Sequence, residues 1–376
     1  MASKSHVTTL TLDLGRIREN LNAVKSHLQN TGGVNPGIIA VIKGFGYGTD
    51  DTVLAKLYAE EGVNYLAVAY VEEGIQLRDS GAKGQIMVLN PDPSTFDMMG
   101  KYRLEPCIIS MEHLNEYLAW VERSGSKLQP VHLNFNSGMH RLGFGENEVR
   151  AVAAAIKNVS GLMLGTVYTH LASTESEEHD QKTLRQLKKF KAMCEVLKEE
   201  FKGLSALSEF KTHSLNSSGV VRFPEHGMDY VRVGLSLLGS ELSRLEIALK
   251  PAVFFKTVIT QIQTVPAGEG VGYGYADSSI NEREIAWLPV GYADGYPRSL
   301  SDGKGRVAVV GQIAPVIGRV CMDLTAVDVT GLNVKVGDEV ELFGDYVSIE
   351  NVSSAADTIP YELIARIHQR VIRKVV

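Results

Sequence analysis

The chain contains 376 residues, of which 44% are hydrophobic and 22% are charged, and its formal net charge is -6. This balance is typical of a folded globular protein, and the length predicts two domains because single domains rarely exceed about 300 residues. Acidic and basic residues are interleaved without a basic block, so we expect no binding to nucleic acid.

The N-terminal segment, MASKSHVTTLTLDL, has no apolar stretch of the kind that directs secretion. No apolar run in the chain approaches the roughly 18 residues of a membrane span, so we expect a cytoplasmic protein without membrane contact. Residues 6–10 within this segment are strand-like, and we expect them to join the second domain.

Eight short β-rich runs follow, separated by helix-patterned segments such as residues 180–202. The runs are GIIAVI (37–42), YLAVAY (65–70), QIMVL (85–89), PCIIS (106–110), VHLNF (131–135), LMLGTVYTH (162–170), KTHS (211–214) and YVRVG (230–234). Alternating strands and helices are the signature of a parallel sheet, and eight such units match a (β/α)8 TIM barrel. We therefore predict an α/β fold with a TIM barrel over residues 11–244, with an open doubly wound sheet as the alternative.

Beyond about residue 245 the pattern changes to short alternating runs interrupted by Gly, Pro and Asp, as in KTVITQIQTV and RVAVV. This pattern predicts a C-terminal all-β domain over residues 245–376. The three cysteines, Cys107, Cys194 and Cys321, lie far apart and form no CxxC pair, so we expect buried thiols and no metal site.

Lys43 comes directly after the first barrel strand, in VIKGFGYG. Active sites of TIM barrels lie at the C-terminal ends of the strands, so its side chain is expected at the barrel mouth. Partial shielding from water favours a neutral amine, which can form a Schiff base and accept a proton. Tyr47 is placed to reach a phosphate. Taken alone, Lys43 is more simply interpreted as a surface lysine, and Tyr47 equally well as a packed aromatic.

Two further polar residues follow the fifth and sixth predicted strands. Arg141 lies in NSGMHRLGF, where a planar guanidinium could bind a carboxylate or a phenolic oxygen, or could form a structural ion pair. His170 ends the sixth strand and could lie against a flat cofactor, although a histidine buried in the core is the simpler interpretation.

The loops after strands seven and eight are where TIM barrels frequently bind phosphate. The seventh strand leads through His213 into LNSSG, where Asn216, Ser217 and the following amides could form an anion cradle. For Ser217 alone, a plain helix N-cap is the simpler interpretation. The eighth strand carries Arg232 and is followed by Gly234.

Three segments of the predicted β-domain carry unusual polar density. GVGYGYADS contains Tyr273 and GYADGYPRSL contains Tyr292, although hairpin turns with incidental tyrosines would have the same pattern. IGRVCMDLTAVDV combines Met322 and Asp323 with a strand pattern. None of these segments indicates a function by itself.

Taken together, the motifs resemble the alanine racemase family, in the same order and across nearly the whole chain. They are VIKGFGYG, NSGMHRLGF, THLAS, HSLNSSG, DYVRVGLSLLG, GVGYG, LPVGYADGYPR and IGRVCMDLTAVDV. The resemblance implies an N-terminal TIM barrel, a C-terminal β-domain and covalently bound pyridoxal 5′-phosphate (PLP). It also implies a head-to-tail homodimer in which each active site borrows residues from the other subunit.

By this resemblance, Lys43 anchors PLP and is one of two catalytic bases, and Tyr273 of the partner chain is the other. Racemisation needs groups on opposite faces of the substrate α-carbon, because one removes a proton and the other returns one. The family pattern assigns Lys43 to the D-enantiomer and Tyr273 to the L-enantiomer. Gly272 precedes Tyr273 where a serine is common, and Tyr275 is a nearby alternative.

The resemblance also implies a set of cofactor-binding residues. Arg232 matches the residue facing the pyridine nitrogen of PLP, where its permanent charge should keep that nitrogen unprotonated. His213 would support Arg232, and His170 would link Tyr273 to the same network. Further cofactor-binding positions are matched by Tyr47, Asn216, Ser217, Gly234, Leu235 and Tyr361.

On the substrate side, Arg141 matches the residue that contacts the cofactor phenolic oxygen and the substrate carboxylate. Met322 corresponds to a substrate-binding backbone position from the partner subunit, and Tyr292 and Tyr361 match aromatics that narrow the entrance and pocket. Many family members carry a carbamylated lysine where this chain has Asn134. We expect a bound anion such as chloride, or Asn134 itself, to orient Arg141.

The function implied by the resemblance is the interconversion of L-alanine and D-alanine, which supplies D-alanine for peptidoglycan. An extra methylene changes pocket discrimination by only about 1–3 kcal/mol, so a serine racemase or a broad-specificity racemase is an alternative. A PLP-binding protein without catalysis is an alternative of a different class. The β-domain with Tyr273 and Met322 argues against it.

Overall fold

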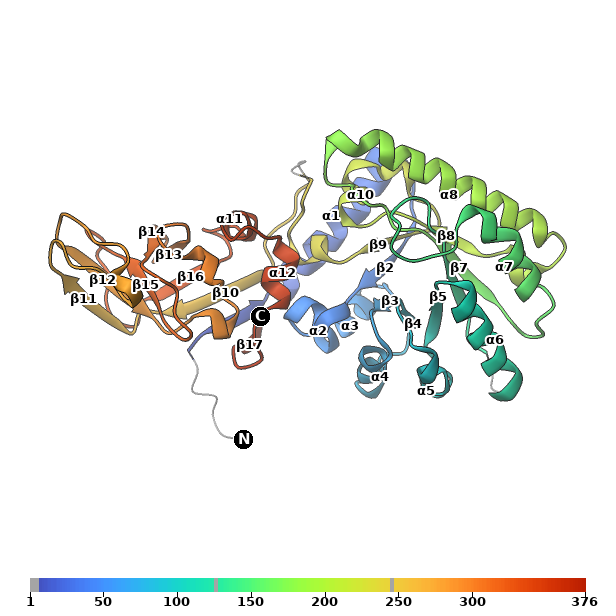
Figure 1. Ribbon diagram of the computed structural model, residues 1–376, viewed down its shortest axis with the longest axis horizontal. Helices are drawn as coiled ribbons and strands as arrows, with labels where there is room; N and C mark the ends of the chain where they lie inside the picture. The colour runs from blue at the N-terminus through green and yellow to red at the C-terminus, as the bar shows by residue number, and fades with distance from the viewer. Residues whose placement is uncertain (1–6, 125–127, 244–246) are drawn as a thin grey trace.

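The computed structural model describes residues 7–124, 128–243 and 247–376 of the chain (Figure 1). A barrel wrapped by helices and a β-rich part lie end to end along the long axis of the molecule. The domain boundary predicted at residues 244 and 245 lies outside the described residues, as does residue 6 of the predicted first strand.

Eight parallel strands of the described chain close into a barrel in sequence order. They are β2 (Gly37–Val41), β3 (Tyr65–Val68), β4 (Gln85–Val88), β5 (Glu105–Ile108), β6 (Val131–Asn134), β7 (Leu164–Tyr168), β8 (Lys211–His213) and β9 (Tyr230–Val233). Their apolar side chains are buried, as expected for strands that face helices outside and each other inside. The predicted TIM barrel is confirmed.

Helices cover the outside of the barrel (Figure 1). They are α1 (Leu14–Gly32), α2 (Lys43–Gly48), α3 (Asp51–Glu60), α4 (Val71–Asp79), α5 (Phe96–Tyr102), α6 (Met111–Ser124), α7 (Val149–Ile156), α8 (Asp180–Glu200), α9 (Ser205–Ser208) and α10 (Ser217–Arg222). In α8, Leu187, Phe190, Cys194 and Leu197 recur every three or four residues and are buried, which is the pattern of an amphipathic helix. Within the described ranges, no helix is long and apolar enough to cross a membrane.

The C-terminal part is built on a sheet whose strand order is β11-β12-β15-β14-β13-β16-β10-β1-β17. The strands are β1 (Thr9–Leu12), β10 (Val253–Val258), β11 (Gln261–Val265), β12 (Arg283–Leu288), β13 (Arg306–Val309), β14 (Gln312–Ile317), β15 (Thr325–Asp328), β16 (Glu339–Phe343) and β17 (Ile372–Val375). β1 pairs antiparallel with β10 and parallel with β17. The domain is mostly β and not all-β, because it also contains the short helices α11 (Ile349–Ala355) and α12 (Pro360–Ala365).

The two parts meet where α12 packs against α2 (Figure 1). A Cβ atom on Gly48 would lie 2.4 Å from the carbonyl oxygen of Ile364, so only glycine allows this approach. Arg373 adds hydrogen bonds from its guanidinium to the carbonyl oxygens of Gly48 and Ile367, with Nη2 at 2.9 Å and 2.6 Å. The end of the chain therefore supports the turn that begins at Lys43.

Candidate active site

Lys43 is the first residue of a left-handed turn at the end of β2. The φ angles of Gly44, Phe45, Gly46 and Tyr47 all lie between 55° and 64°, with ψ near 40–46°, so this is one turn of left-handed helix. For non-glycine residues this conformation costs about 1–2 kcal/mol each, and here Phe45 and Tyr47 adopt it. The turn points the Tyr47 side chain into the barrel rim, where only 8% of its surface is exposed.

Glu73 of α4 holds this turn in place. One carboxylate oxygen accepts a hydrogen bond from the amide of Gly44 at 2.6 Å, and the other accepts from the amides of Ala69 at 2.6 Å and Tyr70 at 3.1 Å. The charge-assisted hydrogen bonds to the Glu73 carboxylate, at the start of α4, thus offset the conformational strain of the turn.

Lys43 is exposed at the barrel mouth, yet neighbouring groups partly shield its amine from water. Partial burial lowers its pKa most, followed by the positive charge of Arg141, while the Glu73 carboxylate raises it. The net effect is a lowered pKa, which increases the fraction of neutral amine. A neutral amine is what a nucleophile and a proton acceptor require.

Three hydroxyl groups converge beside the turn. The rings of Tyr47 and Tyr361 lie 5.7 Å apart, and the hydroxyl of Tyr361 hydrogen-bonds with that of Ser217. The Ser217 hydroxyl also accepts a hydrogen bond from the amide of Gly234 at 3.3 Å. Burial raises the pKa of Tyr361 to about 12, so its phenol stays protonated and can donate to an anion.

Glycine is required at the centre of this cluster. A Cβ atom on Gly234 would lie 2.3 Å from the hydroxyl oxygen of Tyr47, so the close approach of that tyrosine depends on the missing side chain. Leu235 follows directly and is buried. Asn216, and not Ser217, is the N-cap of α10, because its side-chain oxygen accepts from the amide of Gly219 at 2.9 Å. The Ser217 hydroxyl is therefore available for the cluster.

Arg232 lies in the barrel interior with 5% of its surface exposed. Its guanidinium donates to the carbonyl oxygens of Thr169 at 2.8 Å and Ser214 at 3.1 Å. It also contacts Nδ1 of His213 at 2.5 Å and Nδ1 of His170 at 3.2 Å. Burial lowers the pKa of Arg232 to about 10, so the group remains a cation at neutral pH.

Both histidines beside Arg232 are neutral. Burial, and then the charges of Arg232 and Arg141, lower the pKa of His170 to about 3. Burial is also the main cause that lowers the pKa of His213 well below its usual range. Because a guanidinium can only donate, Nδ1 of each ring must accept, which leaves the proton of each on Nε2.

Arg141 lies in the loop after β6, exposed on the Lys43 side of the mouth. It lines a cavity of about 10 Å3 together with Asn134 and His170. A space of this size holds about one water molecule or small ion. A Cβ atom on Gly143 would lie 2.9 Å from the side-chain oxygen of Asn134, so the loop packs tightly over that amide.

Three of the four site residues predicted in the β-domain lie away from the barrel mouth. Tyr273 is 70% exposed and Met322 54% exposed, and both line one cavity of about 500 Å3. Tyr292 is 43% exposed, and its amide donates to the carbonyl oxygen of Cys321 at 3.1 Å. Tyr275 is 84% exposed and is not among the residues that line this cavity. Tyr273 is therefore the tyrosine that shares a pocket with Met322.

A network of charges braces the segment that carries Met322. Arg370 donates to Asp294 at 2.6 Å and 2.9 Å and to Asp323 at 2.7 Å. The amide of Ala293 donates to the carbonyl oxygen of Met322 at 3.0 Å. The cysteine beside it, Cys321, is partly exposed, which corrects the expectation that all three thiols are buried.

Within one chain, the barrel residues and the β-domain residues of the predicted site do not meet. The strands β11 and β12, whose connection carries Tyr273, lie at the end of the molecule remote from the barrel, and Met322 lines the same cavity as Tyr273 (Figure 1). Lys43, Arg141, His170 and Arg232 surround the barrel mouth. Tyr361 is the exception, because α12 carries it to the barrel rim.

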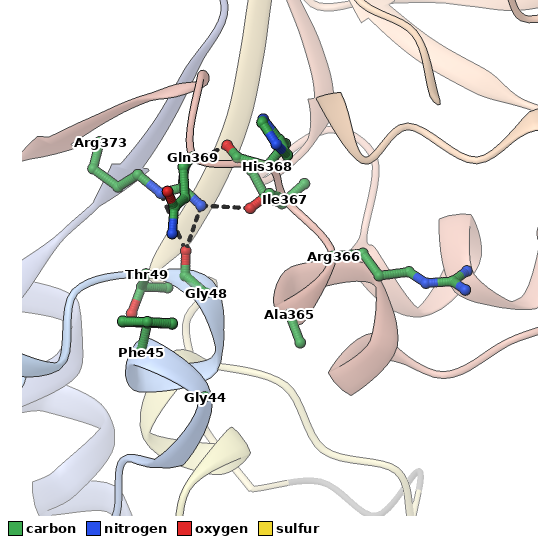
Figure 2. Close-up of a pocket in the computed structure, with 10 residues that line it drawn as sticks. All are labelled: Gly44, Phe45, Gly48, Thr49, Ala365, Arg366, Ile367, His368, Gln369 and Arg373. Atoms are coloured by element: carbon green, nitrogen blue, oxygen red, sulfur yellow. Dashed lines mark hydrogen bonds between the residues drawn. The ribbon is translucent and has the colours of Figure 1, made fainter. Parts of the chain in front are cut away.

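A separate pocket of about 580 Å3 lies between α2, which forms the Lys43 turn, and the loop that precedes β17. Figure 2 shows Arg373 reaching across it to the carbonyl oxygen of Gly48, whereas Arg366 points away. The donors of Arg373 are occupied by backbone carbonyls of both domains. We regard this pocket as part of the domain junction.

Sequence reasoning missed several residues that shape the site. Glu73 supports the Lys43 turn, Arg373 supports its far end, and Arg370 braces the Met322 segment. Arg370 and Arg373 follow no barrel strand, and Glu73, although it lies soon after β3, is in no glycine-rich motif. A glutamate near the start of a helix signals capping, so the pattern around Glu73 indicated only a helix N-terminus.

Comparison with known proteins places this geometry in a family. The family domain described as "Alanine racemase, N-terminal domain" matches residues 12–241, and "Alanine racemase, C-terminal domain" matches residues 252–375. A similar sequence is the alanine racemase of Halothermothrix orenii, 37% identical over 372 residues that cover 96% of this chain and 95% of the relative.

Two solved structures are similar over nearly the whole chain. The biosynthetic alanine racemase from Pseudomonas aeruginosa has a TM-score of 0.86 at 31% identity and covers 99% of both chains. An alanine racemase from Bartonella henselae, solved with covalently bound pyridoxal phosphate, has a TM-score of 0.87 at 26% identity. It covers 98% of this chain and 99% of its own.

Proposed function

The chain belongs to the alanine racemase family and is an isomerase, and we propose that it interconverts L-alanine and D-alanine with Lys43 and Tyr273 as two bases. The observation that carries this proposal is the arrangement at the barrel mouth. A lysine of lowered pKa lies beside two arginines, and a cluster of hydroxyls around a glycine lies next to it. Lysine, anion cradle and buried cation are the parts that a PLP racemase needs.

We propose PLP as the cofactor, and the residues present fit it. The hydroxyls of Tyr47, Ser217 and Tyr361, with the amide of Gly234, suit a phosphate, and the glycine keeps their approach open. Asn216 and Leu235 complete this side of the site. When bound, PLP supplies the electron sink that lets a weakly acidic Cα–H be removed.

Arg232 would hold the ring nitrogen of the cofactor. Its guanidinium has only donors and stays charged, so it should favour an unprotonated ring nitrogen. An unprotonated ring draws less charge from the substrate carbon, which restrains side reactions such as transamination. His213 supports the guanidinium from behind, and His170 lies on its other side with an Nε2 proton to offer a second group.

Lys43 would anchor the cofactor and exchange the proton on one face of the substrate. Its lowered pKa leaves more neutral amine at a given pH, which serves attachment and proton removal alike. The family pattern assigns this face to D-alanine. Arg141 would bind the substrate carboxylate and the phenolic oxygen of the cofactor, in an orientation set by Asn134 or by a small anion in the shared cavity.

Tyr273 would serve the other face from a second copy of the chain. Tyr273 and Met322 are exposed and remote from Lys43 in one chain, so a homodimer that seats this pocket over the partner's barrel mouth would complete each site. Tyr292 and Tyr361 would narrow the entrance. We propose that each subunit divides near residue 245 into a barrel and a β-domain that includes the N-terminal strand.

We further propose that the enzyme acts in the cytoplasm and supplies D-alanine for peptidoglycan. A narrow pocket lined by tyrosines favours a small side chain, although serine remains a second substrate to measure. Racemisation assays with alanine and serine at equal concentrations would rank the two. A chain that binds PLP tightly but racemises neither amino acid would support the non-catalytic alternative.

Mixing two inactive variants tests the shared site. Lys43→Ala and Tyr273→Phe chains are each expected to be inactive as homodimers. A heterodimer of the two has one site with both changes and one intact site. Random reassociation should therefore restore up to about a quarter of the wild-type activity per chain. No recovery, despite heterodimers detected by native mass spectrometry, would reject the two-subunit site.

A further inference from the structure

A thread of polar side chains runs through the barrel interior beneath Arg232. His213 Nε2 lies 2.9 Å from the hydroxyl of Thr166, and that hydroxyl lies 2.9 Å from Nδ1 of His132. His132 Nε2 lies 3.0 Å from a carboxylate oxygen of Glu105. All of these side chains are buried, with exposed fractions of 5% or less. TIM barrel interiors are usually filled by layers of apolar side chains, so a row of buried polar side chains in this interior requires an explanation.

The thread spans the barrel from its mouth to its opposite end. His213 is the last residue of β8, whereas Glu105 is the first residue of β5. In a parallel barrel the first residues of the strands lie opposite the mouth. Tyr65, the first residue of β3, donates its hydroxyl to the same Glu105 oxygen at 3.0 Å, and Gln85 donates to the other oxygen at 3.3 Å.

The two ends of the thread fix the direction of its first and last hydrogen bonds. Arg232 has only donors, so Nδ1 of His213 accepts and its Nε2 carries the proton. That proton goes to the Thr166 oxygen, and a Thr166 hydroxyl that in turn donates to Nδ1 of His132 continues the same direction. His132 in turn carries its proton on Nε2 and donates to Glu105. An ionised carboxylate can only accept, so the last link agrees with the first.

Glu105 is suited to be the terminal acceptor. Burial opposes its ionisation, but the hydrogen bonds that it accepts from His132, Tyr65 and Gln85 favour the carboxylate, and its pKa is lowered. A buried carboxylate is stable only when its lone pairs are satisfied in this way. Aligned hydrogen bonds polarise one another, so the anion strengthens each link up to the guanidinium.

We propose that Glu105, His132 and Thr166 are positioning residues for Arg232, acting through a one-directional hydrogen-bond chain that presents Nδ1 of His213 as a fixed acceptor. These hydrogen bonds hold the Arg232 guanidinium in the position in which it contacts the ligand at the barrel mouth. The role of these residues in catalysis rests on the proposed racemase function, whereas the direction of the hydrogen bonds does not depend on it.

The direction can be measured first, in the full-length enzyme as purified. The protein is labelled with 15N-histidine and examined by solid-state NMR, in which the two neutral tautomers and the cation have different nitrogen shifts. His213 and His132 are assigned by comparison with His213→Gln and His132→Gln. Both should be neutral with the proton on Nε2. A doubly protonated His132, or a proton on Nδ1 of either ring, would overturn the chain.

The coupling to Arg232 is measured with two substitutions. Glu105→Gln removes the anion while keeping the shape, and Thr166→Val removes the central hydroxyl. Each is expected to lower kcat by about tenfold, the loss of one buried hydrogen bond, with KM changed less than about twofold. Thr166→Ser keeps a hydroxyl and should restore most of the activity. Thr257→Val, which removes a buried hydroxyl of the β-domain, is the matched control.

A spectroscopic readout separates positioning from general damage. In enzyme loaded with ring-15N PLP, the ring-nitrogen shift reports the hydrogen bond from Arg232. It should move in Glu105→Gln and Thr166→Val, but not in Thr166→Ser or Thr257→Val. An unchanged shift and unchanged kcat in both chain variants would overturn the inference.

The failure of the proposed function would look different. In that case the wild-type enzyme would neither retain PLP nor racemise alanine, whereas the histidine tautomers would still report the direction of the chain. Should Glu105→Gln not fold, the comparison of Thr166→Val with Thr166→Ser decides the question.

Discussion

The barrel and the β-domain carry their parts of the proposed site in opposite states of burial. Arg232 and His213 are 5% and 0% exposed, and their hydrogen bonds are made within the chain. Tyr273 and Met322 are 70% and 54% exposed. The barrel residues therefore make their contacts within one chain, whereas Tyr273 and Met322 remain exposed in it.

The two regions differ because the interactions that stabilise the barrel residues require a buried environment. Desolvation and buried hydrogen bonds set the charge states of Arg232 and His170, and both act only where water is excluded. Tyr273 and Met322 are instead exposed and line one cavity of about 500 Å3, and apolar side chains exposed together are typical of a surface that binds another molecule. In the proposed dimer, that molecule is a second copy.

The largest expected effect is at Lys43. Lys43→Ala should lower racemisation by at least about 1,000-fold, because it removes both the anchor and one base. Borohydride reduction followed by peptide mass spectrometry should find the cofactor on Lys43 in the wild type and nowhere in the variant. Lys304→Ala, on the exposed surface of the β-domain, is the control. A labelled residue other than Lys43 would refute the assignment.

Tyr273→Phe tests the exposed half of the comparison. Loss of one general base is expected to lower kcat by about 100-fold to 10,000-fold while PLP remains bound. In deuterated water, exchange at the α-carbon starting from L-alanine should be affected more than exchange starting from D-alanine. Tyr275→Phe should retain most of the activity. If Tyr275→Phe proves the damaging change, the second base has been assigned to the wrong tyrosine.

Gly234→Ala tests the packing of the barrel half. The new methyl group would overlap the Tyr47 hydroxyl, and such overpacking typically costs about 1–3 kcal/mol. We expect PLP affinity to fall by about tenfold or more, measured by fluorescence titration, with the fold retained by circular dichroism. Gly15→Ala in α1, whose nearest contact is the Asp13 side chain at 3.2 Å, is the control. Unchanged PLP affinity would show that the cradle does not hold the cofactor.

The buried histidines predict a pH dependence of stability. His170 binds a proton at about pH 3 in the folded chain but near 6.5 when unfolded, so the unfolded state takes up more protons between these values. This stability is fully present above about pH 6.5 and is lost as the pH falls towards 3. From pH 6.5 to 5 the loss is about 1.5 kcal/mol for one histidine.

Thermal unfolding measures this difference. The unfolding temperature of the wild type should fall between pH 6.5 and 5, and that of His170→Gln should fall less, because glutamine takes up no proton. Parallel curves for the two proteins would contradict the lowered pKa of His170.

The smallest expected effect concerns Asn134. If a small anion orients Arg141, the KM for alanine should rise a few-fold when chloride is replaced by a large organic anion. Asn134→Asp should remove this dependence, because its carboxylate can pair with the guanidinium directly. A KM that does not depend on the chloride concentration and is also unchanged in Asn134→Ala would show that neither the anion nor Asn134 orients Arg141.

Much of the barrel could be predicted because its signals are local. A short apolar run followed by a polar turn is typical of a buried parallel strand, and each of the eight runs overlaps one strand of the barrel. The position of Lys43 at a strand end follows from the same pattern. The helices α11 and α12 were missed because they are short and lie among strand-like segments.

The sequence by itself determined the fold class, the family and the position of Lys43, because these depend on short patterns and on motifs in a fixed order. Tertiary structure decided which residues support those motifs. Glu105, His132, Thr166 and His213 come from four strands spread over more than a hundred residues, and only closure of the barrel aligns their donors and acceptors. Glu73 likewise meets Gly44 only after the left-handed turn has formed. Hydrogen bonds of this kind depend on distances of about 3 Å, which no linear pattern encodes.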